Sequence, residues 1–281
     1  MGIGKAARKR LGQVMVILIL SAGAVAVMIP FFWMLSTSLK GEADILTFPP
    51  DWIPRPAYWD NYVKAVTVIP FFNYLKNTLT VTVVRLVGTV LTSALVAYGF
   101  ARLRAPGLDT LFLIVLSTMM LPGQVTLIPT FIIFSKIDWI DTFLPLVVPA
   151  YFGGGAFNVF LLRQFFMTIP LEMDDAARID GCSYFGVFWR IIVPLSAPAL
   201  ATVSIFNVMW SWNEFMGPLI YLQSTSKFTL ALGLNFFRDV YNPTWNLLMA
   251  NSVLLLLPCL LLFFFAQRLF IQGVVVTGIK G

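Results

Sequence analysis

The chain has no histidine, only two cysteines and few charged residues. Of its 281 residues 11% are charged and 59% are hydrophobic, whereas a soluble domain carries about 25% charged residues. Without histidine, the commonest general base and the commonest transition-metal ligand are missing, which excludes most hydrolytic triads and zinc sites. The two cysteines, Cys182 and Cys259, are far apart and give neither a disulfide framework nor a metal-binding spacing. With its strongly positive mean hydropathy, this composition indicates an integral membrane protein.

Six apolar runs are long enough to cross a bilayer as helices, which takes about 20 residues each. We predict spans at 14–36, 72–100, 110–134, 143–165, 198–221 and 247–270. Pro30, Pro122, Pro149 and Pro258 fall inside these runs, where neighbouring helices can satisfy the backbone groups that proline frees. The expected fold is an all-α membrane protein with an N-terminal segment 1–13, a six-span domain 14–270 and a C-terminal tail 271–281.

Lysine and arginine predict the orientation, because they are in excess in cytoplasmic segments. Placing the N-terminus inside puts the larger group there: Lys5, Arg8, Lys9, Arg10, Arg102, Arg104, Arg163, Arg178, Arg190, Arg268 and Lys280. The outside segments then hold Lys40, Arg55, Lys64, Lys136, Lys227 and Arg238. Both termini are therefore predicted in the cytoplasm. The first run is too long for a typical signal peptide, so we expect it to remain as a helix.

The stretch 171–181, LEMDDAARIDG, is the densest charge cluster in an otherwise apolar chain. Pro170 suits a helix start, where its missing N–H costs nothing. Acidic residues follow in the first turns and Arg178 lies near the end, as the helix dipole favours. Gly181 can take the left-handed conformation that closes a helix. The pattern predicts a short cytoplasmic helix between spans four and five.

Apolar residues flank this turn on both sides. Met173, Ala176 and Ala177 are expected to share one face of the first helix, by their spacing. After Gly181, the segment CSYFGVFWRIIVPLSAP predicts a second helix with a stripe formed by Tyr184, Phe185, Phe188 and Trp189. Either these aromatic residues stay exposed and mark an interface, or they fold back onto the chain's own helix ends; the residues alone leave both readings open.

The segment DDAARIDGCSYFGVFWRIIVPL resembles the cytoplasmic coupling-loop signature of ABC importer permeases. That signature reads Glu-Ala-Ala, three residues, Gly, nine residues, then Ile-x-Leu-Pro. Here Asp175 replaces the usual glutamate and Val193 the usual leucine, and every spacing is kept. YLKNTLTVTVV, AYGFARLRAPG, WNEFMGPLIYL and the C-terminal MANSVLLLLPCLLLFFFAQRLFIQGVVVTGIKG extend the resemblance over nearly the whole chain. Among carbohydrate-type permeases, the chain resembles the second, six-span permease of maltose-type importers.

The resemblance implies a type I ABC importer permease fold with a two-helix coupling loop at about 166–195. It implies a bacterial or archaeal plasma membrane location, a second permease subunit, a dimeric cytoplasmic ATPase and an extracytoplasmic solute-binding protein. Loop residues expected to dock on the ATPase are Asp175, Ala176, Ala177, Asp180, Gly181, Phe185, Ile191 and Pro194. The matching residues of the tail, which is expected to reach between the ATPase subunits, are Gly278, Lys280 and Gly281.

No cofactor, metal or catalytic residue is expected in this chain. It lacks the G-x-x-x-x-G-K-[ST] phosphate-binding loop, so ATP and magnesium would be bound by the partner ATPase. The expected role is half of a translocation pathway for a sugar or oligosaccharide. Glycerol-3-phosphate or a related polyol is the alternative solute.

Polar residues inside the predicted spans are candidates for the translocation path, because charges are costly at bilayer depth. Arg85 in span two and Glu214 in span five are the two charged candidates, and they could pair with each other. We expect Arg85 to tie helices together or line a cavity rather than bind the solute directly, and for Glu214 a structural hydrogen-bonding role stands beside solute contact. Asn207, Trp210 and Asn213 lie near Glu214 and suit a sugar path, although tryptophans at helix ends also anchor at the interface. Gly153–Gly155 in span four interrupt a helix, either as a mobile gate or as a kink that allows close packing.

Two other classes of function have less support. A stand-alone secondary transporter would want an internal repeat and several membrane-embedded ionisable groups, and the sequence shows no convincing repeat and few such groups. A membrane enzyme would need catalytic groups within reach of one another. Asp174 and Asp175 are adjacent, so on a helix they point in different directions and make a poor acid–base pair.

Overall fold

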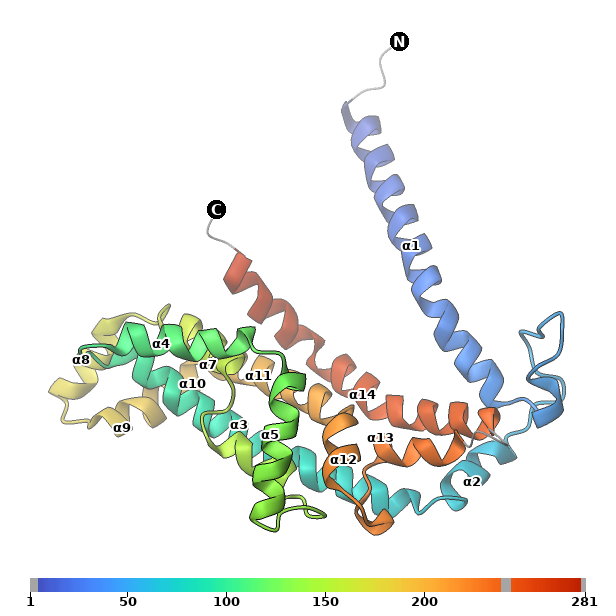
Figure 1. Ribbon diagram of the computed structural model, residues 1–281. Coiled ribbons are helices and arrows are strands. Elements are labelled where there is room, and N and C mark those ends of the chain that lie inside the picture. Colours follow the sequence, from blue (N-terminus) through green and yellow to red (C-terminus); the bar gives the residue numbers. More distant parts are fainter. Residues whose placement is uncertain (1–4, 239–243, 279–281) are drawn as a thin grey trace. The chain divides into compact units, whose positions relative to one another are not determined.

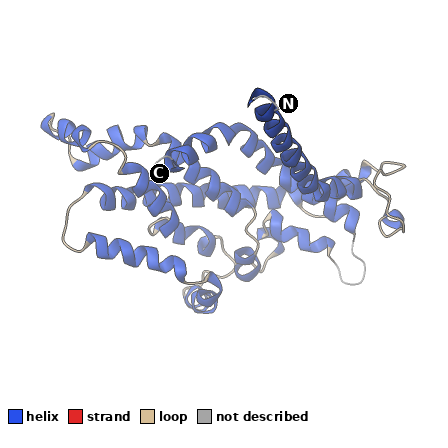
Figure 2. Cartoon of the chain, turned by 90° about the horizontal axis from the view of Figure 1, so that it is seen from above, coloured by secondary structure: helices blue, strands red, loops and turns tan. Residues whose placement is uncertain are grey.

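The computed structural model describes residues 5–238 and 244–278, with side chains for 10–238 and 244–267. The described residues form helices joined by loops, and none of them lies in a strand (Figure 2). This confirms the all-α prediction. The helices form two compact units, Met1–Ile69 with Leu234–Leu256 and Pro70–Gly233 with Leu257–Gly281, which are considered separately.

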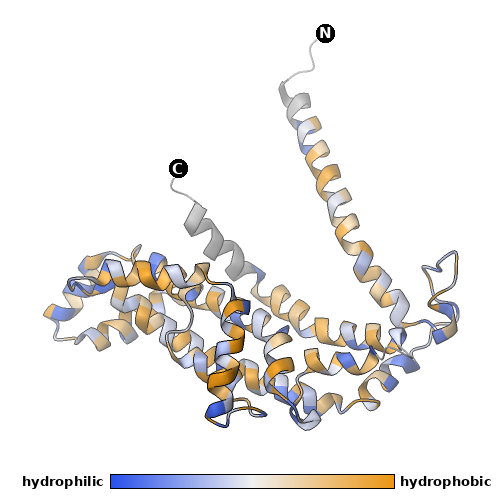
Figure 3. Ribbon diagram, in the orientation of Figure 1, coloured by the Kyte–Doolittle hydropathy of each residue, from blue (hydrophilic) through white to orange (hydrophobic). Residues whose placement is uncertain are grey.

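The first unit holds α1 (Lys5–Ser38), α2 (Asp60–Thr67), two single 3-10 turns (Glu42–Asp44 and Leu234–Phe237) and the beginning of α14 (Trp245–Gly278). Helix α1 is mostly apolar and has no distinct polar face. Figure 3 shows apolar residues along most of its described length. None of its most apolar window is buried within the chain. A helix that is hydrophobic on every side needs lipid or another helix around it, so α1 has the character of a membrane span.

Asparagines join the elements of the first unit. Asn61 of α2 donates to the carbonyl oxygens of Ser38 and Lys40, both at 2.9 Å. Asn251 of α14 donates to the carbonyl of Ala65 at 3.0 Å. These amides satisfy carbonyl groups that the ends of α1 and α2 leave without a partner inside their own helices.

The second unit is built around α3 (Phe71–Arg102), which packs against α7 (Ala156–Phe166) and α11 (Ala197–Trp212) (Figure 1). The other membrane-region helices are α4 (Leu108–Ser117), α5 (Gly123–Lys136), α6 (Leu144–Val147), α12 (Met216–Tyr221) and α13 (Leu230–Gly233). Short 3-10 turns occur at Thr118–Met120, Val148–Tyr151 and Thr225–Lys227. Fully buried apolar side chains between α3, α7 and α11 include Ala97, Leu162 and Val203.

Among the described residues, four helical segments are long and apolar enough to cross a membrane: Arg10–Ser38, Phe71–Arg102, Leu144–Phe166 and Trp245–Gln267. Two bent pairs, Leu108–Met120 with Gly123–Lys136 and Tyr184–Leu195 with Ala197–Trp212, raise the number to six if each pair is one span. The predicted third span, 110–134, is therefore not one straight helix, because the first pair bends by 96°. Pro122 lacks an N–H and holds the preceding Leu121 in an extended conformation, which ends the 3-10 turn that follows α4.

The predicted fifth and sixth spans also differ from the structure at their ends. The predicted helix over 198–221 stops at Trp212, and the chain resumes as α12 at Met216. Glu214 lies in this break and accepts a hydrogen bond from the Gly217 N–H at 2.9 Å, which satisfies a free donor at the start of α12. Pro149, expected inside a helix, lies in a 3-10 turn. Helix α14 continues to Gly278, past the expected end at 270.

The glycine run between α6 and α7 is a turn that presses against α3. Gly153, Gly154 and Gly155 all have positive φ, at 93°, 64° and 90°. A Cβ on Gly154 would lie 2.4 Å from the carbonyl oxygen of Thr89 and 2.7 Å from the backbone nitrogen of Ser93. Glycine is therefore required at this position both for the left-handed backbone and for the close approach. The structure supports the interpretation of this run as a kink that allows close helix packing. It does not test the interpretation as a mobile gate.

An aspartate joins two loops at the opposite end of the second unit from α8. Asp141 accepts hydrogen bonds from Ser224 Oγ at 2.5 Å, Ser224 N at 2.9 Å and Gln223 N at 3.0 Å. Lys227 Nζ lies 3.0 Å from the same carboxylate and also donates to the Asp141 carbonyl. The hydrogen bonds from Ser224 are the main reason that the pKa of Asp141 is held well below its ordinary value. The carboxylate thus connects the α5–α6 loop to the loop after α12.

We expect Gly154→Ala to lower stability by about 1–3 kcal/mol more than Gly153→Ala, the difference being the cost of overpacking. Gly153 is the matched control because it has φ 93° with open space where its Cβ would be, so its substitution carries only the strain of the left-handed backbone. Thermal unfolding of the two variants in detergent measures the difference. Equal losses would mean that the turn does not need its contact with α3.

We expect Asp141→Asn to lower stability at pH 7 by about 1–2 kcal/mol, because charge-assisted hydrogen bonds are lost. Since the pKa of Asp141 is lowered in the folded state, its contribution is present above the unfolded value of about 3.9 and is lost as the pH falls further. The gap between wild type and variant should therefore shrink below pH 4 in thermal unfolding. Asp138→Asn is the control, since Asp138 is exposed in the same loop with a similar φ of 56°. A gap that does not change with pH would contradict the assignment.

Candidate functional site

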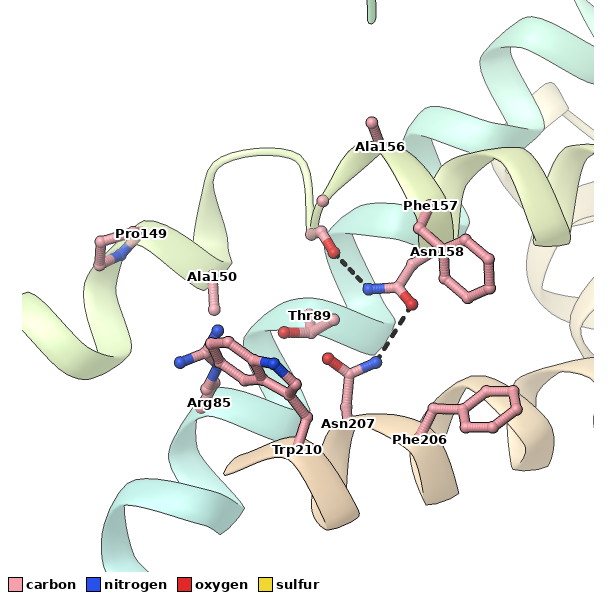
Figure 4. Close-up of a pocket in the computed structure, with 12 residues that line it drawn as sticks. Arg85, Thr89, Pro149, Ala150, Ala156, Phe157, Asn158, Phe206, Asn207 and Trp210 are labelled. Atoms are coloured by element: carbon pink, nitrogen blue, oxygen red, sulfur yellow. Dashed lines mark hydrogen bonds between the residues drawn. The ribbon is translucent and has the colours of Figure 1, made fainter. Parts of the chain in front are cut away.

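A cavity of about 640 Å³ lies in the second unit, where the glycine turn leaves a gap between α3 and α11. Figure 4 shows the side chains around it, which come from α3, the 3-10 turn Val148–Tyr151, α7 and α11. Its lining consists of Arg85, Thr89, Pro149, Ala150, Gly154, Gly155, Ala156, Phe157, Asn158, Phe206, Asn207 and Trp210. The walls are mostly apolar, with one cation and two amides, which is the usual composition of a site for a small ligand.

Two asparagines in the cavity wall form hydrogen bonds that connect α11, α7 and the glycine turn. Asn207 of α11 donates through Nδ2 to Asn158 Oδ1 of α7 at 3.2 Å, and Asn158 Nδ2 donates to the carbonyl of Gly154 at 2.7 Å (Figure 4). Thr92 of α3 donates to the carbonyl of Ala150 at 3.0 Å. Side chains thus satisfy carbonyl groups that the broken helix exposes, which is how irregular backbone is tolerated at membrane depth.

Arg85 and Trp210 form the charged side of the cavity. The guanidinium carbon of Arg85 lies 4.1 Å from the centre of the Trp210 ring (Figure 4). This is a cation–π contact, a favourable way to hold a guanidinium among apolar side chains. Sequence reasoning selected Arg85, Asn207 and Trp210, and the structure brings these three together. Sequence reasoning did not select Asn158. Its position could have been noticed, because it is a polar amide residue within the apolar run that follows the three glycines.

Asn213 and Glu214 lie apart from that group. They line an adjacent cavity of about 580 Å³ that shares Phe206 and Trp210 with the first one. The suggested Arg85–Glu214 pair is not formed: the side-chain ion pairs within 4.0 Å in the described part of the chain do not include it. Instead, Glu214 caps α12. Asn213 donates to the carbonyl of Met209 at 2.8 Å, so its amide is also partly used within its own helix.

The expected loop helix is α8 (Leu171–Ile179), which Gly181 ends with a φ of 87°. Pro170 is its N-cap residue, one position before the expected one. Of the three residues expected to share a face, Ala177 is buried, whereas Met173 and Ala176 are exposed. Asp174 takes their place beside Ala177 on the buried face. Hydrophobic periodicity alone does not predict the burial of Asp174, because it assigns only apolar residues to the buried face of a helix.

The second loop segment consists of α9 (Tyr184–Val187), a π-helical turn (Phe188–Ile192) and α10 (Val193–Leu195). Some of its aromatic residues fold back onto the chain's own helices and others remain exposed, so each of the two interpretations of the sequence holds in part. Phe188 is 1% exposed in the core beside Tyr98, whereas Phe185 is 61% exposed. Tyr184, Trp189 and, at the end of α8, Ile179 are exposed as well. The loop is therefore anchored to its own helices and still presents an apolar surface.

The other residues expected to dock are mostly accessible. Among them, Asp175, Ala176, Asp180, Gly181 and Pro194 are exposed, and Ile191 is half-buried. Ser183 caps α9 by accepting a hydrogen bond from the Gly186 N–H at 3.2 Å. In the tail, Gly278 is the last residue of α14, and Lys280 and Gly281 lie outside the described residues.

Sequence reasoning missed an ion pair beneath α8. Arg102, the last residue of α3, lies with its Nε 3.4 Å from Asp174 Oδ2, and the two side chains are 3% and 12% exposed. Arg102 also donates to the carbonyl of Ile169 at 2.8 Å. Burial raises the pKa of Asp174, with Arg102 acting in the opposite direction and Asp175 adding to the rise. Arg102 therefore favours the charged form of this carboxylate against the effect of its burial, and the pair connects α3 to the loop.

Comparison with known proteins places these features in context. Residues 90–276 match a protein family described as "Binding-protein-dependent transport system inner membrane component". The permease protein of an arabinooligosaccharides transport system from Halalkalibacterium halodurans is 34% identical over 247 residues, which cover 88% of this chain and 86% of that protein. A permease protein from Thermoanaerobacterium thermosulfurigenes, of a probable starch degradation products transport system, is 30% identical over 89% of this chain and 91% of that protein.

A solved structure has the same fold. One chain of a bacterial ABC transporter involved in the import of the acidic polysaccharide alginate superposes with a TM-score of 0.81. The alignment covers 95% of this chain and 99% of the other, at 20% identity. This likeness confirms the predicted type I permease fold.

We expect Arg102→Gln to lower stability by about 3 kcal/mol at pH 7, because it leaves a buried carboxylate without its counter-charge. A folded-state pKa that is raised gives stability that is complete below the unfolded value and is lost as the pH rises through the folded pKa. The penalty in Arg102→Gln should therefore be small near pH 4 and grow toward pH 7 in thermal unfolding.

Two further variants make this test specific. Adding Asp174→Asn to Arg102→Gln should recover most of the loss at pH 7, because the buried charge is then removed. Arg104→Gln, an exposed arginine two residues further on, should change little. A pH-independent loss, or no recovery in the double variant, would mean that Arg102 acts only through its packing and its hydrogen bond to Ile169.

Proposed function

The chain belongs to the family of binding-protein-dependent transport system inner membrane components, and on that premise we propose that it is a permease subunit of an ATP-driven importer for a sugar or oligosaccharide. It would form half of the translocation pathway together with a second permease. A dimeric ATPase in the cytoplasm and a solute-binding protein outside would complete the importer. In this role the chain itself is not an enzyme.

The observation that carries the coupling role is the exposed apolar surface of the α8–α9 loop. Ile179 is 87% exposed and Phe185 is 61% exposed. Ile179 lies outside every candidate span, and Phe185 is the second residue of the bent pair Tyr184–Leu195 with Ala197–Trp212. Apolar residues on a well-anchored, charged loop are typical of a docking surface. The buried Arg102–Asp174 pair supports a rigid connection from this surface to α3. A force on the loop would therefore reach the helix that lines the cavity.

The proposed solute class rests on two supports. Two relatives are named for the transport of arabinooligosaccharides and of starch degradation products. The cavity supplies what sugars use: the aromatic rings of Trp210, Phe157 and Phe206 for stacking, and amides for hydroxyl groups. Glycerol-3-phosphate or a related polyol is the second candidate, and Arg85 is the residue that favours it.

The partners follow from similar arguments. The family description itself refers to a binding protein. The exposed apolar surface of α1 supports contact with a membrane helix of the second permease as well as with lipid. Since the chain has no phosphate-binding loop, ATP and magnesium would be bound by the ATPase. We propose a plasma membrane location with both termini in the cytoplasm, where residues Gly278, Lys280 and Gly281 would contact the ATPase.

We expect a tagged chain, expressed with its neighbouring permease, ATPase and binding-protein genes, to co-purify with the ATPase and to support ATP-dependent uptake in proteoliposomes. Phe185→Asp should reduce recovery of the ATPase at least tenfold, because it places a charge in the docking surface. Phe185 is a better probe than Ala177, whose burial means that a charge there would disturb the core.

Leu46→Asp is the matched control, since Leu46 is also apolar and 86% exposed but lies in the loop between α1 and α2. It should retain the ATPase. If the chain purifies alone and moves solute without ATP, the proposal is wrong and a secondary transporter takes its place. If both variants retain the ATPase, the loop is not the docking surface.

A further inference from the structure

Arg85 presents its charge to the cavity without a protein acceptor. Its Nε is buried and has no hydrogen-bond partner. Among the described residues, the guanidinium of Arg85 forms no hydrogen bond or ion pair with another side chain or backbone group. It lies over the ring of Trp210. Arg102 and Arg163, by contrast, both donate to backbone carbonyls and lie near carboxylates. Arg85 is therefore different from the arginines that hold the fold together.

Among the described residues, no carboxylate forms an ion pair with Arg85 within 4.0 Å. Glu214 attracts Arg85 electrostatically, but the two do not form an ion pair, and one Glu214 oxygen is engaged with the Gly217 N–H. A cation among apolar side chains at membrane depth is costly unless it is paired. The cation–π contact with Trp210 offsets part of that cost. The donors of the guanidinium remain available on the cavity side.

The geometry of these free donors selects a chemical group. A guanidinium is planar and offers a fork of N–H groups that matches two oxygens of a carboxylate or phosphate. Around it, Trp210, Phe157 and Phe206 supply ring faces, and Asn207 supplies an amide. A cavity of about 640 Å³ has room for a ligand of small-molecule size. The combination fits a sugar or polyol that carries an oxyanion better than it fits a neutral one.

We propose that this cavity binds an anionic carbohydrate through its oxyanion, a carboxylate or a phosphate, and that Arg85 is the residue that determines this specificity. The inference rests on the proposed function and narrows its solute class. Arg85 would form the bidentate contact, and Trp210 would hold the guanidinium flat while offering its ring to the sugar.

The test uses the whole importer, purified with its partner subunits and reconstituted with ATP. Four probes distinguish the sources of the oxyanion: trigalacturonate against neutral galactotriose, and glycerol-3-phosphate against glycerol. Uptake of one anionic probe should exceed that of its neutral match at least tenfold. Arg85→Gln should remove this preference, and Arg85→Lys should retain only part of it, because lysine keeps the charge without the fork.

Lys76→Gln is the matched control, because it removes a positive charge from an exposed position on the same helix. It should leave the preference unchanged. Recovery of the assembled complex shows whether each variant folds. A second readout, the shift in melting temperature of the purified complex with each probe, reports binding without transport and should be lost for the anionic probe only in the Arg85 variants.

The outcomes separate the two proposals. Equal uptake and equal thermal shifts for anionic and neutral probes, or an Arg85→Gln variant that keeps the preference, would overturn the inference and leave the importer standing. If an anionic preference disappears only when a carboxylate of the partner permease is also changed, Arg85 serves as a tie between subunits and the inference is wrong. If no probe is taken up with ATP, the proposed function fails, and the thermal shifts still decide whether Arg85 binds an oxyanion.

Discussion

The contact between the glycine turn and α3 is the constraint on which the second unit depends. At Gly154, backbone meets backbone, with no space for a side chain between the turn and residues 89–93. This approach lets Tyr151 reach over Gly88 and donate to the Val84 carbonyl at 2.9 Å. It also interrupts the helix there, and the interruption leaves the space that becomes the cavity. Close packing and the cavity thus have the same origin.

Much of this architecture could be predicted from the sequence, because the signals are local. Apolar runs of about 20 residues are read from composition, and the turn at Gly181 is read from a cap and a glycine. The bends were not predicted. Whether a proline such as Pro122 ends a helix or is absorbed, as Pro258 is in α14, depends on the neighbours that satisfy the freed backbone groups. That is information about packing, which periodicity does not contain.

The candidate sites divide in the same way. Arg85 and Trp210 were identifiable because charge and large aromatic rings are conspicuous in an apolar run. Their contact with each other, and the absence of a pair with Glu214, were not, since both depend on where α11 ends. Asp174 and Arg102 are the clearest omission. Each looks like an ordinary surface charge in the sequence, and only the folded chain shows that the loop closes over both of them.

One helix carries both the cavity and the loop anchor. Arg85 and Arg102 lie on α3 about 25 Å apart along its axis, given a rise of 1.5 Å per residue. Between them, Gly88 and Thr89 fit against the glycine turn, and this middle section tolerates little change. The two ends are not in contact, so substitutions at one end need no compensation at the other. If the proposed function holds, such a helix lets the end at the cavity diversify over evolutionary time while the end that anchors the loop stays the same.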